Sequence, residues 1–471
     1  MKIKMGAGRL SMSDIACFTG CGCTGNVSLD FEYVCTDSRE ADKDSLFVAF
    51  KGERVDGHDY IPAAYNLGCR CFLVERADTV PADSCALVVE DSTAALIKIS
   101  KACGDRVDCV RIGITGSVGK TTTKEFVACV ASRRYNTHKT FGNYNSTIGM
   151  PLTLMETPED TGVSVLEMAM SGLGEISQMS CAANPDIAII TNIGSSHMEA
   201  LGSKQNILKA KLEITDGLSS DGYLIINGDD PMLAEQTYSI DHVLKIGIKN
   251  QASDYYAYNI KTTEDGTCFD IRHGNEAIEN IKIPTIGEHN VYAALIAVAV
   301  GGIIGIDGSD LRDGLASYKS VGLRQRIVSI GELTVIEDCY NASPESMRAA
   351  INVLRTVKHA DGRAIALLGD MRELGSNSDT FHREIGRYVF EHNIDLLFTI
   401  GGAARHIAAG AVEAGMSDEN VFVNVDEETY TATAWEIWRQ VKAGDVLLVK
   451  ASRAIRAERV IEQLKRLESS N

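Results

Sequence analysis

The chain has 471 residues, of which 45% are hydrophobic and 23% charged, and it carries a formal net charge of −18 at pH 7. This length predicts about three domains, and the acidity argues against nucleic acid as a partner, because a phosphate backbone needs a basic surface. No run approaches the ~18 apolar residues of a membrane span, and the N-terminal MKIKMGAGRLSMSD lacks the apolar core of a secretion signal, so we expect a cytoplasmic protein.

Residues 1–90 predict a small α/β domain. The runs FEYV, SLFVAF, CRCFLVER and CALVVE have the composition of strands, and residues 93–103 have helical periodicity. Cys17, Cys21 and Cys23 contain no CxxC pair and have no histidine nearby, which argues against zinc. We therefore interpret them, like the other cysteines, as reduced and buried apolar side chains.

A phosphate-binding loop is predicted by RIGITGSVGKTTTKEF at residues 111–126. Apolar strand residues lead into a glycine turn and then into a helical pattern. Gly116 and Gly119 allow backbone N–H groups to surround phosphate oxygens at a helix N-terminus. Lys120 can reach the terminal phosphates, and the Thr121 hydroxyl can bind Mg²⁺. The motif is the short form GxxGKT, because Ile114 stands where the longer motif has its first glycine.

The central domain is predicted to span residues 91–320, with strands and helices that alternate and therefore form a mostly parallel sheet. Glu167 ends the strand VSVLE, where it is either a Mg²⁺ ligand or an ordinary strand-end acid. His197 follows another strand, and a lone histidine is more often structural than a ligand. From the residues alone, Lys211 belongs on a solvated helix face, and Asn290 either caps a helix or contacts a base.

The third domain, residues 321–471, repeats the alternation of strands and helices and predicts a doubly wound, Rossmann-like sheet. Its strands include LTVIEDC, AIALLGD, DLLFTIG and DVLLVK, and a helix is expected from Pro344 to Val357. Asp338 ends one strand. Near the C-terminus KASRAIRAER is strongly basic and either receives an anion or forms a solvated face.

Taken together, these segments resemble the Mur ligase family, the ATP-dependent amide-forming enzymes of peptidoglycan precursor synthesis. The resemblance covers nearly the whole chain and includes TDSREADKDSLFVAFKGERVDGHDYIPAA, TGSVGKTTTKE, EMAMSGLGEI, TNIGSSHME, KAKLEI and GEHNVYAAL. It implies three α/β domains that bind, in chain order, a UDP-linked substrate, ATP and an amino substrate.

The resemblance also implies roles for individual residues. It implies an ATP site of Gly116, Ser117, Gly119, Lys120, Thr121, Thr122, Asn290, Arg324 and Asp338. It implies catalytic roles for Lys120, Glu167, His197, Lys211 and Arg324. It implies two Mg²⁺ sites held by Thr121, Glu167, His197 and Lys211, with Lys211 carbamylated. It implies substrate contacts by Ser38, Arg39, Asn143, Ser171, Asn341, Ser343 and Arg453.

Within the family, FGNYNSTIGMPLTL, EDCYNASPESM and LLGDMRELG followed by His382 resemble the member that adds D-alanyl-D-alanine to a UDP-N-acetylmuramoyl-tripeptide. The implied reaction passes through an acyl phosphate, and the implied enzyme works as a monomer. The sequence does not say whether the tripeptide ends in lysine or diaminopimelate.

Three departures and several alternatives remain. Ser146 replaces a usual asparagine, Glu337 the first residue of a DD pair, and Ala451 a usual glycine. The segment GLRQR differs from the usual pattern, so Arg324 is preferred to Arg326. The third-residue-adding ligase and a folylpolyglutamate synthetase share this scaffold, and a non-catalytic UDP-peptide sensor is a different class. A GTPase-type switch would need an NKxD motif, which is absent from the sequence.

Overall fold

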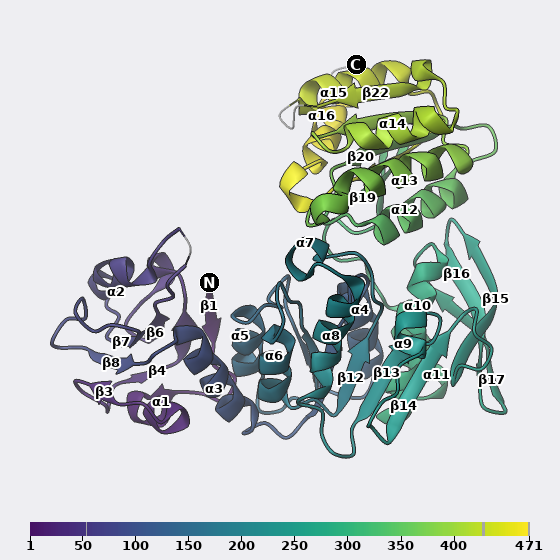
Figure 1. Ribbon diagram of the computed structural model, residues 1–471. Coiled ribbons are helices and arrows are strands. Elements are labelled where there is room, and N and C mark those ends of the chain that lie inside the picture. The colour runs from purple at the N-terminus through teal and green to yellow at the C-terminus, as the bar shows by residue number, and fades with distance from the viewer. Residues whose placement is uncertain (53, 426–428, 470–471) are drawn as a thin grey trace.

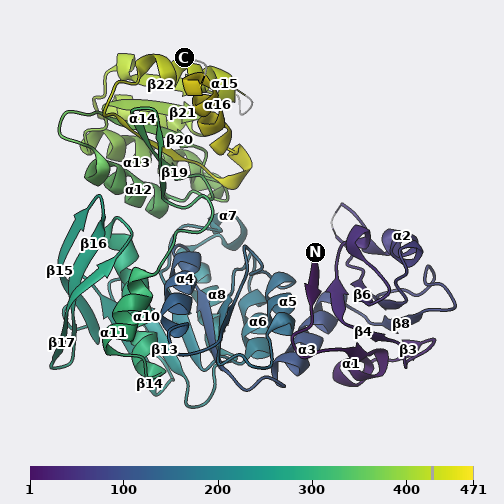
Figure 2. The same ribbon diagram turned by 180° about the vertical axis from the view of Figure 1, so that it is seen from behind.

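The computed structural model describes residues 1–52, 54–425 and 429–469. Within these residues the strands form three large sheets, of six, nine and six strands, and one small two-stranded sheet. Figure 1 shows three α/β bodies in chain order, with the C-terminal body lying over the central one. The view from behind in Figure 2 shows the N-terminal body to one side of both. The predicted α/β fold class is confirmed, and the boundaries at residues 90 and 320 stay predictions.

The N-terminal sheet is parallel in its middle and has an antiparallel strand at each edge. Across the sheet the strands are β1 (Lys2–Lys4), β5 (Tyr33–Cys35), β6 (Ser45–Val48), β7 (Cys71–Val74), β8 (Cys85–Val88) and β3 (Cys23–Thr24). The small sheet pairs β2 (Leu10–Ser11) with β4 (Asp30–Phe31), and the helices are α1 (Met12–Thr19), α2 (Ile61–Asn66) and α3 (Ser92–Gly104).

Successive residues of these strands face opposite sides of the sheet, as the pleat requires. Leu46 and Val48 belong to the core that includes residues of α1 and α3, whereas Phe47 lies in the core with α2. The cysteines only partly match the prediction, because Cys17 is exposed and Cys21 is half-buried, whereas those within β5, β7 and β8 are buried.

The central sheet combines a parallel part with an antiparallel ribbon. Across the sheet the strands are β10 (Thr137–Lys139), β11 (Val163–Glu167), β9 (Val110–Thr115), β12 (Ile187–Ile190), β13 (Tyr223–Asn227), β14 (His242–Gly247), β15 (Tyr255–Thr263), β16 (Gly266–His273) and β17 (Glu276–Ile283). The helices are α4 (Lys120–Ala131), α5 (Gly149–Glu156), α6 (Glu175–Ala183), α7 (Met198–Leu201), α8 (Lys204–Leu212), α9 (Pro231–Ala234), α10 (Glu288–Ile303) and α11 (Gly308–Ala316).

The parallel part, from β10 to β15, confirms the prediction, but the antiparallel ribbon that β15 forms with β16 and β17 was not predicted. Parallel strands are covered on both faces and are therefore apolar throughout; every residue of β12 is buried. Ile112 and Ile114 of β9 pack with α4 and α10 on one face. Ala188 and Ile190 of β12 pack with α6 and α8 on the other.

The C-terminal sheet is parallel except for its first strand. Across the sheet the strands are β18 (Arg326–Ile330), β19 (Leu333–Asp338), β23 (Val446–Lys450), β20 (Ala364–Gly369), β21 (Leu396–Ile400) and β22 (Val421–Asn424). The helices are α12 (Pro344–Val357), α13 (Ser378–Glu391), α14 (Arg405–Ala414), α15 (Tyr430–Gln440) and α16 (Glu458–Ser469).

Helix α12 has the bounds predicted from the sequence, because its ends are encoded locally. Ser343 is the N-cap of a capping box, and Pro344 occupies the first helical position, where its missing N–H costs nothing. Helices α12, α13 and α14 cover one face of the sheet, and α15 and α16 cover the other. Among the described residues, no helix combines the length and apolar composition that a membrane crossing requires.

Candidate active site

A cavity of about 650 Å³ opens between the central and C-terminal bodies. The phosphate-binding loop after β9, the end of β11, the segment after β12, the segment after β19 and the last residue of β23 contribute to its lining. All of these are carboxyl ends of parallel strands, where α/β sheets bind ligands. Among the predicted residues, it is lined by Ser117, Gly119, Lys120, Thr121, Thr122, Glu167, His197, Asn290, Arg324, Asp338, Asn341 and Ser343.

The phosphate-binding loop has the backbone that its glycines permit. Gly116 has a φ of +142°, and a Cβ there would lie 1.9 Å from Oγ1 of Thr191. Gly119 has a φ of +88° and directly precedes α4. Lys120 Nζ donates to the carbonyl of Gly116 at 2.7 Å. The enclosed position of Lys120 lowers the pKa of its ammonium group, and the Glu167 carboxylate opposes this shift.

The segment after β12 supports this loop. Val118 N–H donates to Oδ1 of Asn192 at 2.9 Å, and the N–H of Gly194 donates to Oγ of Ser117 at 2.8 Å. The loop and the segment after β12 therefore form one hydrogen-bonded unit.

Glu167 lies beside the first threonine of α4. The Thr121 hydroxyl donates to the Glu167 carboxylate, with oxygen distances of 3.0 and 3.2 Å, and Asn145 Nδ2 donates to the same carboxylate at 2.7 Å. Lys124 Nζ lies 3.9 Å from Oε2 of Glu167 and donates to the carbonyl of Thr140 at 2.6 Å. Hydroxyl and carboxylate oxygens are the ligands that Mg²⁺ prefers, so this pair fits that ion.

Lys211 contradicts the expectation of a solvated helix face. Its side chain is 0% exposed, and among the described residues Nζ has no hydrogen-bond partner. Burial lowers the pKa of Lys211 well below the usual lysine value, and the nearby Lys120 lowers it further. Lys211 therefore carries an amine that is easily deprotonated. Lys211 is not among the residues that line the cavity.

His197 is half-buried in the segment that leads into α7. Its Nδ1 lies 2.6 Å from Oε2 of Glu373, a residue of the C-terminal body. The hydrogen bond from His197 lowers the pKa of the Glu373 carboxyl group. Across the described parts of the chain, no three His, Cys, Asp or Glu side chains are grouped to hold a metal ion. The predicted Mg²⁺ set instead combines one acid and one histidine with a threonine and a lysine.

Asn290 is buried in the first turn of α10 but does not cap it, because the N-cap is Gly287. Its Nδ2 donates to the carbonyl of Ile286 and to Oε1 of Gln325, each at 3.0 Å. The Arg324 guanidinium lies 4.0 Å from the centre of the Tyr340 ring. The predicted base contact and the predicted phosphate-binding arginine thus both line the cavity.

Asp338 also lines the cavity and binds a lysine of the basic run KASRAIRAER, which the sequence predicted either to receive an anion or to form a solvated face. Lys450 is buried, and its Nζ donates to Oδ2 of Asp338 at 2.6 Å and to the carbonyl of Asn341 at 2.9 Å. Arg453 of the same run is exposed and pairs with Glu458 at 2.7 Å. The run therefore divides into a buried structural lysine and exposed arginines.

Glu345 in the first turn of α12 makes a further contact between the bodies. Its Oε1 accepts from the backbone N–H of Ser195 at 2.9 Å and from the Ser195 hydroxyl at 3.0 Å. Ser195 adjoins Gly194, which supports the phosphate-binding loop. Glu345 therefore ties the C-terminal body to the segment behind this loop.

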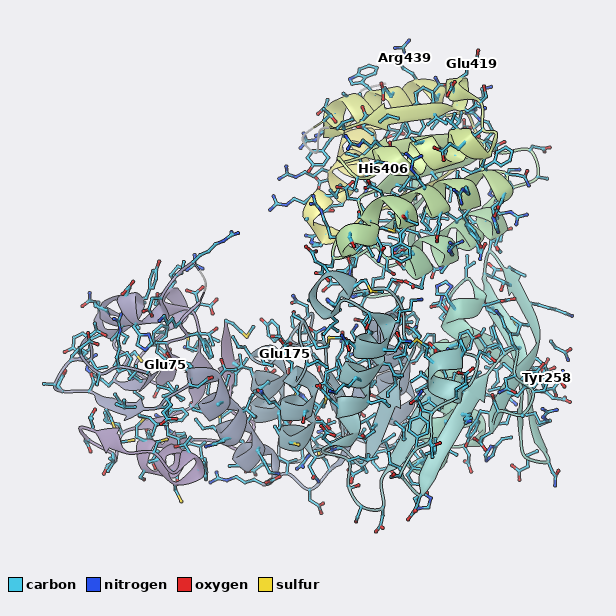
Figure 3. The ribbon with its side chains drawn as sticks, viewed as in Figure 1. Glu75, Glu175, Tyr258, His406, Glu419 and Arg439 are labelled. Carbon is cyan, nitrogen blue, oxygen red and sulfur yellow. The ribbon has the colours of Figure 1, made fainter. Side chains whose placement is uncertain are left out.

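Several predicted substrate residues lie outside the cavity: Ser38, Arg39, Asn143, Ser171 and Arg453. Arg39 is exposed and pairs with Asp37 at 2.6 Å in the N-terminal body. The N–H of Ser171 donates to Oε2 of Glu175 at 2.8 Å. Glu175 begins α6, in the part of the central body nearest the N-terminal body (Figure 3). These residues therefore do not contribute to the lining of the cavity around the phosphate-binding loop.

Sequence reasoning missed Asn145, Glu345, Glu373 and Lys450. Asn145 lies within FGNYNSTIGM, and Glu345 and Glu373 lie within two of the motifs quoted for the family resemblance, so a signal for their region was present. None of these residue types is unusual, however. Their partners are also distant in the chain, from 22 residues for the Asn145–Glu167 pair to 176 residues for the His197–Glu373 pair.

Comparison with known proteins accounts for this arrangement. Three family models match in order: the Mur ligase family catalytic domain at residues 30–105, the Mur ligase middle domain at 114–301, and the Mur ligase glutamate ligase domain at 324–453. UDP-N-acetylmuramoyl-tripeptide–D-alanyl-D-alanine ligase of Bacillus subtilis is 39% identical over 434 residues, which is 92% of each chain. The enzyme of the same name from Escherichia coli is 30% identical over 93% of this chain and 94% of its own.

Solved structures give the same result. MurF from Acinetobacter baumannii superposes with a TM-score of 0.89 at 27% identity, covering 97% of this chain and 99% of its own. MurF ligase from Thermotoga maritima in complex with ADP has a TM-score of 0.83 at 28% identity, covering 93% and 98%. By sequence over nearly its whole length and by fold, the chain belongs to the Mur ligase family.

Proposed function

We propose that this ligase joins D-alanyl-D-alanine to UDP-N-acetylmuramoyl-tripeptide and converts ATP to ADP and phosphate. The observation that carries the proposal is a cavity lined both by the phosphate-binding loop and by Asp338, Asn341 and Ser343 of the C-terminal body. Such a cavity can hold a nucleotide on one side and an amine on the other. The similarity to relatives named for this reaction supports the choice of substrates.

The proposed chemistry has two steps. An oxygen of the tripeptide's terminal carboxylate attacks the γ-phosphorus of ATP, the bond to the bridging oxygen breaks, and ADP leaves. The amine of D-alanyl-D-alanine then attacks the acyl carbon, loses a proton and expels phosphate as the amide forms. Phosphoryl transfer depends on positioning and charge neutralisation.

Four side chains and the backbone of the phosphate-binding loop are proposed to hold the nucleotide. Lys120 and the N–H groups around Gly116 and Gly119 bind phosphate oxygens, Asn290 contacts the base, and Arg324 contacts phosphate. Asp338 contacts the ribose. The pairing of Asp338 with Lys450 supports this role, because it fixes the carboxylate at the edge of the cavity. Both bodies then contact ATP, which excludes water from the acyl phosphate.

Mg²⁺ is proposed to be bound by Thr121 and Glu167, with His197 at a second site, and it would supply positive charge to the phosphates. Lys211 is proposed to be carbamylated: its neutral Nζ attacks CO₂, a proton is lost, and a carboxylate replaces an amine. Two observations support this, namely the unpartnered buried Nζ and its lowered pKa. The carbamate would be an oxygen donor near the metal.

The remaining substrate contacts are also proposals. Ser38 and Arg39 would bind the UDP part, and Asn143 and Ser171 the sugar-peptide part. Asn341, Ser343 and Arg453 would bind the dipeptide. We further propose that the enzyme works as a monomer in the cytoplasm, where ATP is supplied.

A phosphate-release assay tests the proposal. Release should require ATP, a UDP-N-acetylmuramoyl-tripeptide and D-alanyl-D-alanine together. Tripeptides ending in lysine and in diaminopimelate, a UDP-dipeptide with either free amino acid, and a folate with glutamate should be run in parallel. Equal phosphate release without D-alanyl-D-alanine would contradict the proposed function. Amide formation between a UDP-dipeptide and a free amino acid would identify the third-residue-adding ligase instead.

A further inference from the structure

The contact between His197 and Glu373 links the proposed metal site to the C-terminal body. Nδ1 of His197 lies 2.6 Å from Oε2 of Glu373, although the two residues are far apart in the chain. His197 lines the cavity, and Glu373 lies in the segment after β20. The proposed chemistry gives a role to His197 but none to Glu373.

The two segments that make this contact are closely fitted. His197 and Glu373 both have a φ of +65°, in the left-handed region that residues other than glycine rarely adopt. Such a conformation persists where the surroundings determine it. The N–H of Glu199 also donates to the carbonyl of Glu373 at 3.0 Å. Gly375 lies so near that a Cβ there would be 3.2 Å from Cα of Glu199.

The arrangement in space agrees with these contacts. Figures 1 and 2 both show α7, which His197 precedes, at the edge of the central body directly beneath the C-terminal body. The contact is therefore part of the docking between the two bodies.

Histidines that bind metals commonly donate their other ring N–H to a carboxylate, which fixes the tautomer and the ring orientation. Here Nδ1 is held by Glu373, which leaves Nε2 for a metal. We propose that Glu373 is the positioning residue for His197, so that the C-terminal body completes the second metal site by docking. This inference rests on the proposed function, because it deepens the role given there to His197.

The test compares Glu373→Ala and Glu373→Gln with the wild-type full-length protein. Free Mn²⁺ is measured by electron paramagnetic resonance in the presence of a non-hydrolysable ATP analogue. Loss of an outer partner of a metal ligand typically weakens metal binding about 10–100-fold. We therefore expect about 10-fold weaker Mn²⁺ binding for Glu373→Ala. Glu373→Gln should lose less, because its amide oxygen still accepts the hydrogen bond.

Glu199→Ala is the matched control. It removes an exposed carboxylate two positions from His197 and leaves the backbone N–H that binds Glu373. Its Mn²⁺ affinity should stay within about 2-fold of wild type, because His197 keeps its partner. Thermal unfolding of each variant checks that the fold is kept.

A second measurement separates positioning from a general loss of docking. Long-range ¹H–¹⁵N spectra report which ring nitrogen of His197 carries the proton, with His197→Gln used for assignment. Wild type should show the Nδ1–H form, and Glu373→Ala should shift toward the other tautomer. Unchanged Mn²⁺ affinity in Glu373→Ala, or an unchanged tautomer, would overturn the inference.

The inference and the proposed function fail in different ways. If wild type releases phosphate equally without D-alanyl-D-alanine, the proposed function fails whatever Glu373 does. If wild type requires all three substrates but Glu373→Ala binds Mn²⁺ as wild type does, only the role of Glu373 is wrong.

Discussion

Lys124, Lys211 and Lys450 are almost fully buried, yet their surroundings give them different properties. Lys124 donates to the carbonyl of Thr140 and lies near two carboxylates, and Lys450 binds Asp338. Lys211 is the one of these three that has no hydrogen-bond partner among the described residues. A buried ammonium without a partner is costly, so the group favours its neutral form. The presence or absence of a hydrogen-bond partner therefore decides whether a buried lysine is structural or reactive.

Replacement of Lys211 by alanine tests the carbamate. Lys211→Ala should lose about 100-fold or more in turnover, because an oxygen donor near the metal would be missing. Acetate added in solution should restore part of the activity by filling the space left by the side chain. Turnover of wild type and variant is measured with and without acetate.

Lys209→Ala is the control for this prediction, since Lys209 lies on the same helix but is exposed. It should keep wild-type turnover and show no response to acetate. Full activity of Lys211→Ala would contradict any role of this residue in the reaction.

The segment after β20 shows how one element positions a distant site. Its first residues are fixed from three sides. Asp370 Oδ1 accepts from the N–H of Ala404 at 2.7 Å, and Nε2 of His382 accepts from the N–H of Met371 at 3.0 Å. The N–H of Arg372 donates to Oγ of Ser452 at 3.0 Å. These bonds hold the backbone that carries Glu373, so α13 supports the contact with His197.

His382 makes the stability of this element depend on pH. Burial lowers the pKa of His382 below the usual 6.5. The unfolded chain therefore takes up the proton first as pH falls. The stability contributed by neutral His382 is complete above about pH 6.5 and is lost as pH falls toward the lowered pKa.

His382→Gln should reduce the fall in unfolding free energy between pH 7 and pH 5, by about 1.4 kcal/mol for each unit that the pKa is lowered. Both tryptophans, Trp435 and Trp438, lie in α15, so their fluorescence reports urea unfolding of the C-terminal body. His359→Gln, at an exposed position of the same body, should leave the pH dependence unchanged. An identical pH dependence in wild type and His382→Gln would show this account of His382 to be wrong.

In the whole molecule, two residues of the segment 195–199 of the central body contact the C-terminal body. Glu345 binds Ser195, and Glu373 binds His197. The same segment supports the phosphate-binding loop through Gly194. The segment that contacts the C-terminal body therefore also supports the phosphate-binding loop, so docking and the conformation of the nucleotide site depend on the same residues.

Glu345→Ala should weaken this docking. It removes hydrogen bonds to a carboxylate that are worth on the order of 2 kcal/mol, or a factor of about 30 in an equilibrium constant. Small-angle X-ray scattering without ligands should give a larger radius of gyration than wild type. Glu384→Ala, which breaks a pair with Arg348 inside the C-terminal body, is the matched control and should not change it. A radius equal to that of wild type in Glu345→Ala would show that this contact does not hold the bodies together.

The sequence by itself determined the phosphate-binding loop, the strand that ends at Glu167 and the bounds of α12. Each depends on residues that are neighbours in the chain: glycines that allow positive φ, apolar runs, and a cap followed by proline. It also determined the family, because motifs from all three parts occur in order.

Only the tertiary structure decided the burial of Lys211, the partners of Lys450 and the contacts of Glu345 and Glu373. It also decided that β15, β16 and β17 extend the central sheet as a ribbon. Burial and pairing depend on groups that folding brings together from distant parts of the chain. Local propensity does not predict which distant residues come into contact. The phosphate-binding loop therefore located the site in the sequence, but the docking contacts around the site could be identified only in the folded structure.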